Sequence, residues 1–106
     1  MLLLGTGGVS LFALQFAKLR GARAIMLSSS DAKLERAKAL GADVGINYAK
    51  HPQWGALVRE ASGGAGVELV VETIGAATFA QSLEAVRMHG MIAVLGWIGG
   101  SEATLP

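Results

Sequence analysis

The sequence contains no cysteine and only two prolines among its 106 residues. Without cysteine the chain can form neither disulfides nor thiolate metal sites, and it has no cysteine nucleophile. Nine basic and eight acidic residues give a formal net charge of +1 and are spread along the chain. This spread provides no basic stripe for nucleic acid. The longest apolar stretches, such as residues 91–98, are far shorter than the roughly 20 residues that cross a bilayer, so we expect no membrane partner.

Apolar residues and glycine are abundant instead. Hydrophobic residues make up 52% of the chain, and 15 residues are glycine, about twice the usual share of about 7%. A chain this apolar, with so little charge, can bury enough surface to fold, which excludes disorder. The glycines have no triplet period, which excludes collagen. Since no signal peptide is recognisable, we expect a cytoplasmic domain.

Short apolar runs alternate with segments of helical period. The runs predict strands at residues 2–4, 24–27, 44–48, 67–71 and 91–95, and helices lie between them. Glycines punctuate the corners, and three of them are predicted to end helices: Gly21, Gly41 and Gly90. Alternation with short loops predicts an α/β fold, a doubly wound parallel sheet with right-handed crossovers and helices on both faces.

Apolar spacing, capping residues and a proline predict where the helices lie. In the first helix one face carries four apolar side chains: Val9, Phe12, Phe16 and Leu19. Residues 28–31 (Ser-Ser-Ser-Asp) favour the start of the second helix. Pro52 suits the first position of the third helix. The fourth helix is marked by Phe79, Leu83 and Val86.

A glycine-rich loop lies between the first strand and the first helix. It contains Gly5, Thr6, Gly7, Gly8 and Val9, and it fits the pattern G-x-G-x-x-G except that Ser10 occupies the third glycine position. The first glycine permits a tight turn, the second lets a pyrophosphate approach the backbone, and the third position requires a small residue for packing. A strand before the loop and a helix after it favour a dinucleotide site. The alternative is a purely structural turn.

The end of the second strand distinguishes NAD from NADP. An acidic residue about twenty positions beyond the loop would bind the ribose hydroxyls of NAD, but Ser28 stands there. The hydroxyls of Ser28, Ser29 and Ser30 could donate to a 2′-phosphate, and Lys33 could pair with it. These features favour NADP(H), with NAD(H) possible. The alternatives are a helix cap for the serines and a solvated surface position for the lysine.

Several segments together resemble the cofactor domain of the medium-chain dehydrogenases/reductases, closest to the zinc-type alcohol dehydrogenase-like and quinone oxidoreductase-like branches. They are residues 5–11, 28–34, 40–43, 46–48, 70–75 and 93–96, and the resemblance covers nearly the whole chain. It implies a Rossmann-type sheet of strand order 3-2-1-4-5, with the usual sixth strand missing. It also implies that Lys33 and Tyr48 contact the 2′-phosphate. The nicotinamide side of the cleft would be lined by Thr73, Ile74, Gly75, Leu95, Gly96 and Trp97. Ser10, in place of the third glycine, would make the helix packing slightly looser.

The resemblance further implies that residues 1–106 are one dinucleotide-binding domain, a fragment of a longer oxidoreductase. The absent catalytic domain would supply any zinc ligands and the site for an alcohol, aldehyde, ketone or quinone, with hydride transfer through the nicotinamide. No catalytic or metal-binding residue is assigned here: His51 and His89 are expected at the surface, and no role is assigned to Glu72. The last strand would be an open edge, so we expect a homo-oligomer formed through it. Alternatives are a non-enzymatic dinucleotide-sensing module and, less favoured, a methyltransferase.

Overall fold

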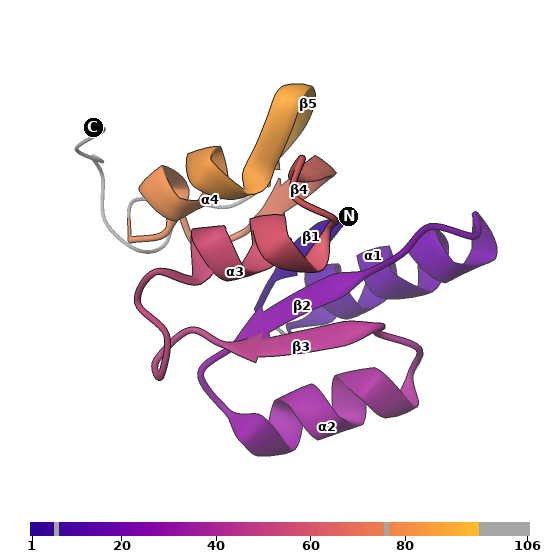
Figure 1. Cartoon of the computed structure of the whole chain (residues 1–106). Helices are drawn as coiled ribbons and strands as arrows, with labels where there is room; N and C mark the ends of the chain where they lie inside the picture. Colours follow the sequence, from indigo (N-terminus) through magenta and orange to yellow (C-terminus); the bar gives the residue numbers. More distant parts are fainter. Residues whose placement is uncertain (6, 76, 96–106) are drawn as a thin grey trace.

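The computed structural model describes residues 1–5, 7–75 and 77–95 (Figure 1). Strands and helices alternate throughout. The strands are β1 (Leu2–Leu4), β2 (Ile25–Ser28), β3 (Val44–Asn47), β4 (Val67–Glu72) and β5 (Val86–Val94). The helices are α1 (Gly8–Leu19), α2 (Asp31–Ala39), α3 (Trp54–Ala61) and α4 (Phe79–Ala85).

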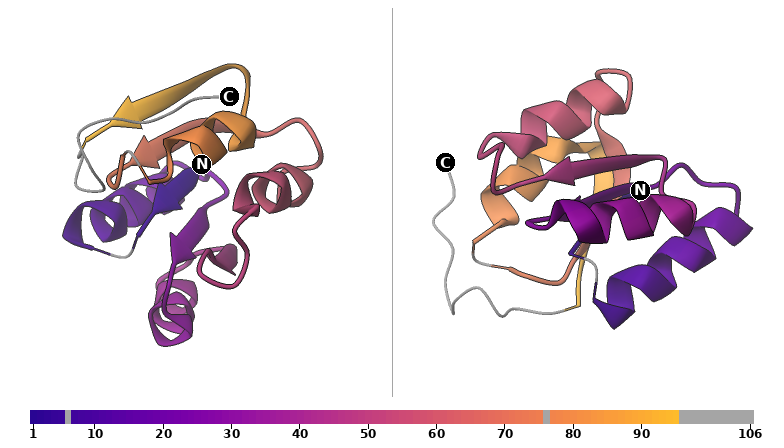
Figure 2. Two further views of the ribbon diagram at one scale, coloured as in Figure 1. Left: turned by 90° about the vertical axis from the view of Figure 1, so that its left-hand side faces the viewer. Right: turned by 90° about the horizontal axis from the view of Figure 1, so that it is seen from below.

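All five strands are parallel and lie in the order β3-β2-β1-β4-β5, which confirms the predicted Rossmann-type topology. Helices cover both faces of the sheet (Figure 2). On one face Leu14 of α1 and Leu34 of α2 pack in the same apolar cluster. On the other face Trp54 of α3 and Ala85 of α4 belong to a second cluster.

The three leucines of β1 occupy the centre of the molecule and are completely buried. Leu2 and Leu4 join the cluster under α3 and α4, whereas Leu3 joins the cluster under α1 and α2. A central parallel strand is covered on both faces, so it is apolar at every position rather than at alternate ones. Each of these side chains contributes about 1.5–3 kcal/mol through burial.

Helix α1 packs on the sheet through a different face from the apolar face that the sequence predicts. The four apolar residues of that face are between 49% and 85% exposed: Val9, Phe12, Phe16 and Leu19. The buried residues of α1 are Ser10, Leu14 and Ala17. Because apolar residues occur on every side of this helix, the helical period alone could not identify the side that faces the sheet.

The boundary between α4 and β5 also differs from the prediction. The helix ends at Ala85, and β5 begins at Val86, which pairs with Val67. The next pair is Leu69 with Met91, so four residues of β5 bulge opposite a single residue of β4. Gly90 therefore lies inside a bulge and does not end a helix. An added Cβ there would lie 2.6 Å from Val86 Cγ2, which explains the glycine.

Pro52 is not the first residue of its helix either. It lies in the turn before α3, which begins at Trp54 after the cap residue Gln53. Gly21 and Gly41, by contrast, directly follow the C-caps of α1 and α2 as predicted.

Candidate functional site

Those residues predicted to bind a dinucleotide that the structure describes lie at one edge of the sheet. Parallel strands have their carboxyl ends on the same side, so the segments that follow β1, β2, β3 and β4 meet there. Strand β1 pairs with β2 on one side and with β4 on its other side. The chain adds β2 and β3 on the first side and then crosses over to add β4 on the second, so the strand order reverses at β1. This reversal of strand order is where ligands bind in open α/β sheets.

The loop after β1 is shaped by two glycines. Gly5 has a φ of +79°, a left-handed conformation that glycine adopts without strain, and its N–H donates to the carbonyl of Leu27 at 2.7 Å. Gly7 is the N-cap of α1; it provides no side-chain cap, and the first turn holds no acidic residue. Among the described residues, no side chain therefore caps the first N–H groups at the positive dipole end of α1.

Open space lies over this helix start. A Cβ added to Gly7 or Gly8 would meet no described atom within 4 Å. Neither residue has a positive φ, so packing and backbone conformation do not require glycine at these two positions. The loop thus leaves room for a group to approach its backbone.

The carbonyl oxygen of Leu4, at the end of β1, accepts two hydroxyl hydrogen bonds. Ser10 Oγ donates to it at 2.7 Å and Thr73 Oγ1 at 2.8 Å. Ser10 is 2% exposed, so its hydroxyl is held in the interior. These bonds tie the first turn of α1 and the end of β4 to the same atom of β1. A glycine at position 10 could not provide the first bond.

The three serines at the end of β2 and directly after it keep donor capacity. Ser28 Oγ accepts the N–H of Ser30 at 3.2 Å, and Ser30 Oγ accepts the N–H of Lys33 at 3.3 Å, which caps α2. A hydroxyl accepting one hydrogen bond still has a proton to donate. The serines are therefore a helix cap and potential anion donors at once. Ser28 is buried and Ser29 exposed.

Asp31 is the carboxylate closest in sequence to these serines, and it is held by the last residue of β3 and by one residue that follows this strand. Asn47 Nδ2 donates to Asp31 Oδ1 at 2.9 Å, and Lys50 Nζ pairs with Oδ2 at 2.5 Å. The hydrogen bond from Asn47, and then that from Lys50, lower the pKa of Asp31. Its charge is thus paired, while Lys33 is exposed and makes no ion pair with any described residue.

Tyr48 follows β3 at the same edge. Its N–H donates to the carbonyl of Ser28 at 3.1 Å, so the backbones of the two predicted residues are adjacent. The Tyr48 ring is half-buried against the cluster under α3 and α4. Lys33 belongs to α2, on the other face of the sheet. The two residues thus flank the carboxyl edge from opposite faces.

The predicted nicotinamide side lies at the ends of β4 and β5. Thr73 is half-buried next to Gly5, and Ile74 and Gly75 follow it directly. The N–H of Leu95 donates to the carbonyl of Glu72 at 2.9 Å, which brings Leu95 to the same place. The other predicted residues, Thr6, Gly96 and Trp97, lie outside the described residues.

Comparison with known proteins agrees with this geometry. The zinc-binding dehydrogenase family matches residues 8–106. This chain belongs to that family. The resemblance to the medium-chain dehydrogenases/reductases is thereby confirmed, and the chain matches the cofactor-binding domain of that family.

Zinc-binding dehydrogenases similar to this chain are considerably longer. A zinc-type alcohol dehydrogenase-like protein of Schizosaccharomyces pombe is 48% identical over 106 residues, all of this chain but 30% of that protein. An NAD-dependent alcohol dehydrogenase structure superposes with a TM-score of 0.90 at 46% identity, covering 99% of this chain and 31% of that one. A mycobacterial protein complexed with NADPH gives a TM-score of 0.84 at 34% identity, covering 99% and 32%.

In this member of the zinc-binding dehydrogenases, the described residues include no group of three or more histidines, aspartates or glutamates that could hold a metal ion. His51 and His89 are both exposed. Nor is any helix in the described part long and apolar enough to span a membrane.

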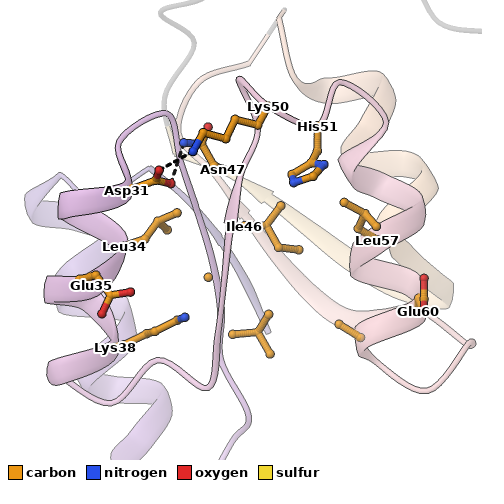
Figure 3. A pocket seen from close by; sticks show the side chains of 13 residues that line it. Asp31, Leu34, Glu35, Lys38, Ile46, Asn47, Lys50, His51, Leu57 and Glu60 are labelled. Carbon is orange, nitrogen blue, oxygen red and sulfur yellow. Dashed lines mark hydrogen bonds and ion pairs between the residues drawn. The ribbon is translucent and has the colours of Figure 1, made fainter.

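A cavity of about 650 Å³ lies elsewhere, between α2 and α3 beside β3 (Figure 3). Charged side chains from both helices line it, among them Glu35, Lys38 and Glu60, and the Asp31–Lys50 pair closes one end. It lies at the outer strand of the sheet and includes no residue of the loops after β1 and β4.

Glu72 is a residue of this edge that the sequence did not assign. It is completely buried and accepts hydrogen bonds from Ile74, Gly75, Thr78 and Ser82. The sequence does contain a signal for this role: Glu72 is a charged residue that ends an apolar strand, and Gly75 and the hydroxyl residues Thr78 and Ser82 follow it.

Proposed function

We propose that this chain binds NADP(H) in preference to NAD(H), as the cofactor domain of an oxidoreductase. The observation that carries the preference is the corner after β2. Two serine hydroxyls there can still donate, Lys33 is exposed without an ion pair to the described residues, and Asp31 is already paired with Lys50. A 2′-phosphate would find donors and a cation there, whereas the carboxylate that selects NAD is absent.

The rest of the edge suits the other parts of a dinucleotide. The pyrophosphate would lie over Gly7 and Gly8, at the N-terminus of α1, where no described atom lies within 4 Å of an added Cβ. The adenosine 2′-phosphate would lie beyond β2, within reach of Ser28, Ser30, Lys33 and Tyr48. The nicotinamide would lie toward β4 and β5, against Thr73, Ile74, Gly75 and Leu95. When bound, the cofactor supplies or accepts a hydride.

The complete protein would be an alcohol dehydrogenase or a quinone or enone reductase. This chain corresponds to about 30% of the length of the S. pombe relative, so we infer that a further domain supplies the substrate site and any zinc ligands. Alcohols, aldehydes, ketones and quinones are the substrate class, and the isolated chain is expected to catalyse no turnover. A cytoplasmic location, and self-association through the edge of β5, remain predictions.

The cofactor proposal is tested by titrating the chain with NADPH and NADH, for wild type and for Lys33→Ala. Losing a charged hydrogen-bond donor should weaken NADPH binding by about tenfold or more and leave NADH binding within about twofold. Lys38→Ala is the matched control, because it removes another exposed lysine from the same helix. An unchanged NADPH-to-NADH ratio in Lys33→Ala would refute the assignment of the 2′-phosphate site.

A further inference from the structure

Glu72 is a carboxylate with no exposed surface, at the last position of β4. Burying a carboxylate is costly unless its oxygens are fully bonded. No contact proposed above for the dinucleotide involves its side chain. Its position between an apolar strand and the nicotinamide-side loop therefore needs its own explanation.

The hydrogen bonds of Glu72 are divided unequally between its two oxygens. Oε1 accepts the N–H of Ile74 at 3.1 Å, the N–H of Gly75 at 2.9 Å and the hydroxyl of Thr78 at 2.7 Å. Oε2 accepts the hydroxyl of Ser82, in α4, at 2.6 Å. One oxygen thus holds three groups of the segment between β4 and α4, and the other attaches that segment to the helix.

All four donors are neutral, and no described residue forms an ion pair with Glu72. What the carboxylate provides is therefore a set of acceptor positions. Those positions match a backbone turn, since Gly75 has a φ of +96° and both N–H groups point to the same oxygen. Without this acceptor, two buried or half-buried N–H groups would lose their partner.

The loop held in this way is bonded to the end of β1, directly before the phosphate loop. Thr73, which directly follows Glu72, donates to the carbonyl of Leu4 at 2.8 Å. Its Oγ1 would lie 3.9 Å from a Cβ on Gly5. The turn at Ile74 and Gly75 is thus fixed on one side by Glu72 and on the other by β1.

We propose that Glu72 is a positioning residue. It holds the backbone of Ile74 and Gly75 in the geometry that receives the nicotinamide half of the dinucleotide, and it contacts no part of the ligand itself. This inference rests on the proposed function. A preformed loop lowers the ordering cost of binding, so loss of the acceptor weakens only the ligand that reaches this loop. The adenosine half binds beyond β2 and is unaffected.

The test compares two ligands, NADPH and adenosine 2′,5′-bisphosphate, which lacks the nicotinamide half. For Glu72→Ala we expect NADPH binding to weaken by about tenfold or more, and bisphosphate binding to stay within about twofold. The amides of Ile74 and Gly75 should also exchange with solvent faster, while those of β1 should not. A general loss of structure would instead weaken both ligands.

Two further variants keep the proposal testable if Glu72→Ala does not fold. Glu72→Gln retains an oxygen for the loop, and its amide nitrogen can donate to Ser82 Oγ, so NADPH binding should stay within about threefold of wild type. Ser82→Ala, the matched control, removes a buried bond to the same carboxylate on the α4 side and should not change the ratio of the two affinities.

The outcomes distinguish the positioning role of Glu72 from the proposed function of the chain. Equal weakening of both ligands in Glu72→Ala, unchanged NADPH binding in that variant, or tenfold weaker NADPH binding in Glu72→Gln would overturn the positioning role. If wild type binds neither NADPH nor the bisphosphate, the proposed function itself is wrong.

Discussion

At the residue scale, the hydrogen bonds at the carbonyl of Leu4 include one residue that the sequence pattern predicts for the site and one contact that it does not predict. The loop pattern predicted Gly5 as the tight turn and Ser10 as the small residue at the third position, and the structure gives Gly5 a positive φ and buries Ser10. The shared acceptor was not predictable, because Thr73 lies 69 residues from Leu4 and meets it only through the pairing of β1 with β4. The role of Glu72 was not predictable for a similar reason, because it depends on the turn that brings the N–H groups of Ile74 and Gly75 to its carboxylate.

Ser10→Gly would complete the glycine pattern, yet we expect it to destabilise the chain. The variant loses a buried hydrogen bond, worth about 0.5–1.5 kcal/mol. It also replaces serine by the poorer helix former glycine, at a further cost of about 0.5 kcal/mol. The free energy of unfolding, measured in urea, should fall by about the sum of the two. Ser29→Gly changes an exposed serine outside any helix and serves as the control.

If Ser10→Gly unfolds at the same urea concentration as wild type, the bond to Leu4 contributes nothing to stability. Packing alone would then explain the small residue at this position.

At the element scale, the strands were predictable and the contact face of α1 was not. A run such as Leu2–Leu4 allows only one interpretation, since a central parallel strand is buried on both sides. In α1 apolar side chains lie all around the helix axis, so the helical period does not identify the face that packs. That face is determined by tertiary packing against the sheet. The end of α4 was missed because Val86 fits the helical period but pairs with Val67 of β4.

Two substitutions in α1 distinguish its faces. Leu14 is fully buried and Phe12 is 71% exposed, two residues apart on the same helix. Leu14→Ala should lower the free energy of unfolding by about 2–5 kcal/mol through lost burial and a cavity. Phe12→Ala should change it by less than about 0.5 kcal/mol. Urea unfolding of both variants makes the comparison. A larger effect at Phe12 would mean that the predicted apolar face packs after all.

At the scale of the whole molecule, the two outer strands of the sheet differ in character. Beside β3 the surface is a cavity lined by charged side chains from α2 and α3 (Figure 3). Charged side chains next to an edge strand discourage pairing with another chain. Along β5, which is nine residues long, Met88, Met91 and Val94 are exposed, with Leu95 following, although Arg87 and His89 are exposed there as well. The apolar edge is therefore the one suited to association.

We expect two copies of the chain to associate through β5, since an outer strand leaves backbone N–H and C=O groups for a second strand. The mass in solution, measured by light scattering over a range of concentrations, should rise from that of a monomer toward that of a dimer. Met91→Lys places a charge on this strand and should keep the chain monomeric. Phe12→Lys is the matched control, because it places the same charge on the exposed apolar face of α1 and should leave the dimer intact.

The reverse pattern, with Phe12→Lys monomeric and Met91→Lys dimeric, would assign association to the face of α1. A wild type that stays monomeric at the highest concentration would refute association of this chain. Because β5 ends next to Glu72, through the bond from the N–H of Leu95, pairing at this edge would also constrain the nicotinamide side of the site. NADPH should then bind more tightly at concentrations where the dimer forms, and Met91→Lys should remove that dependence.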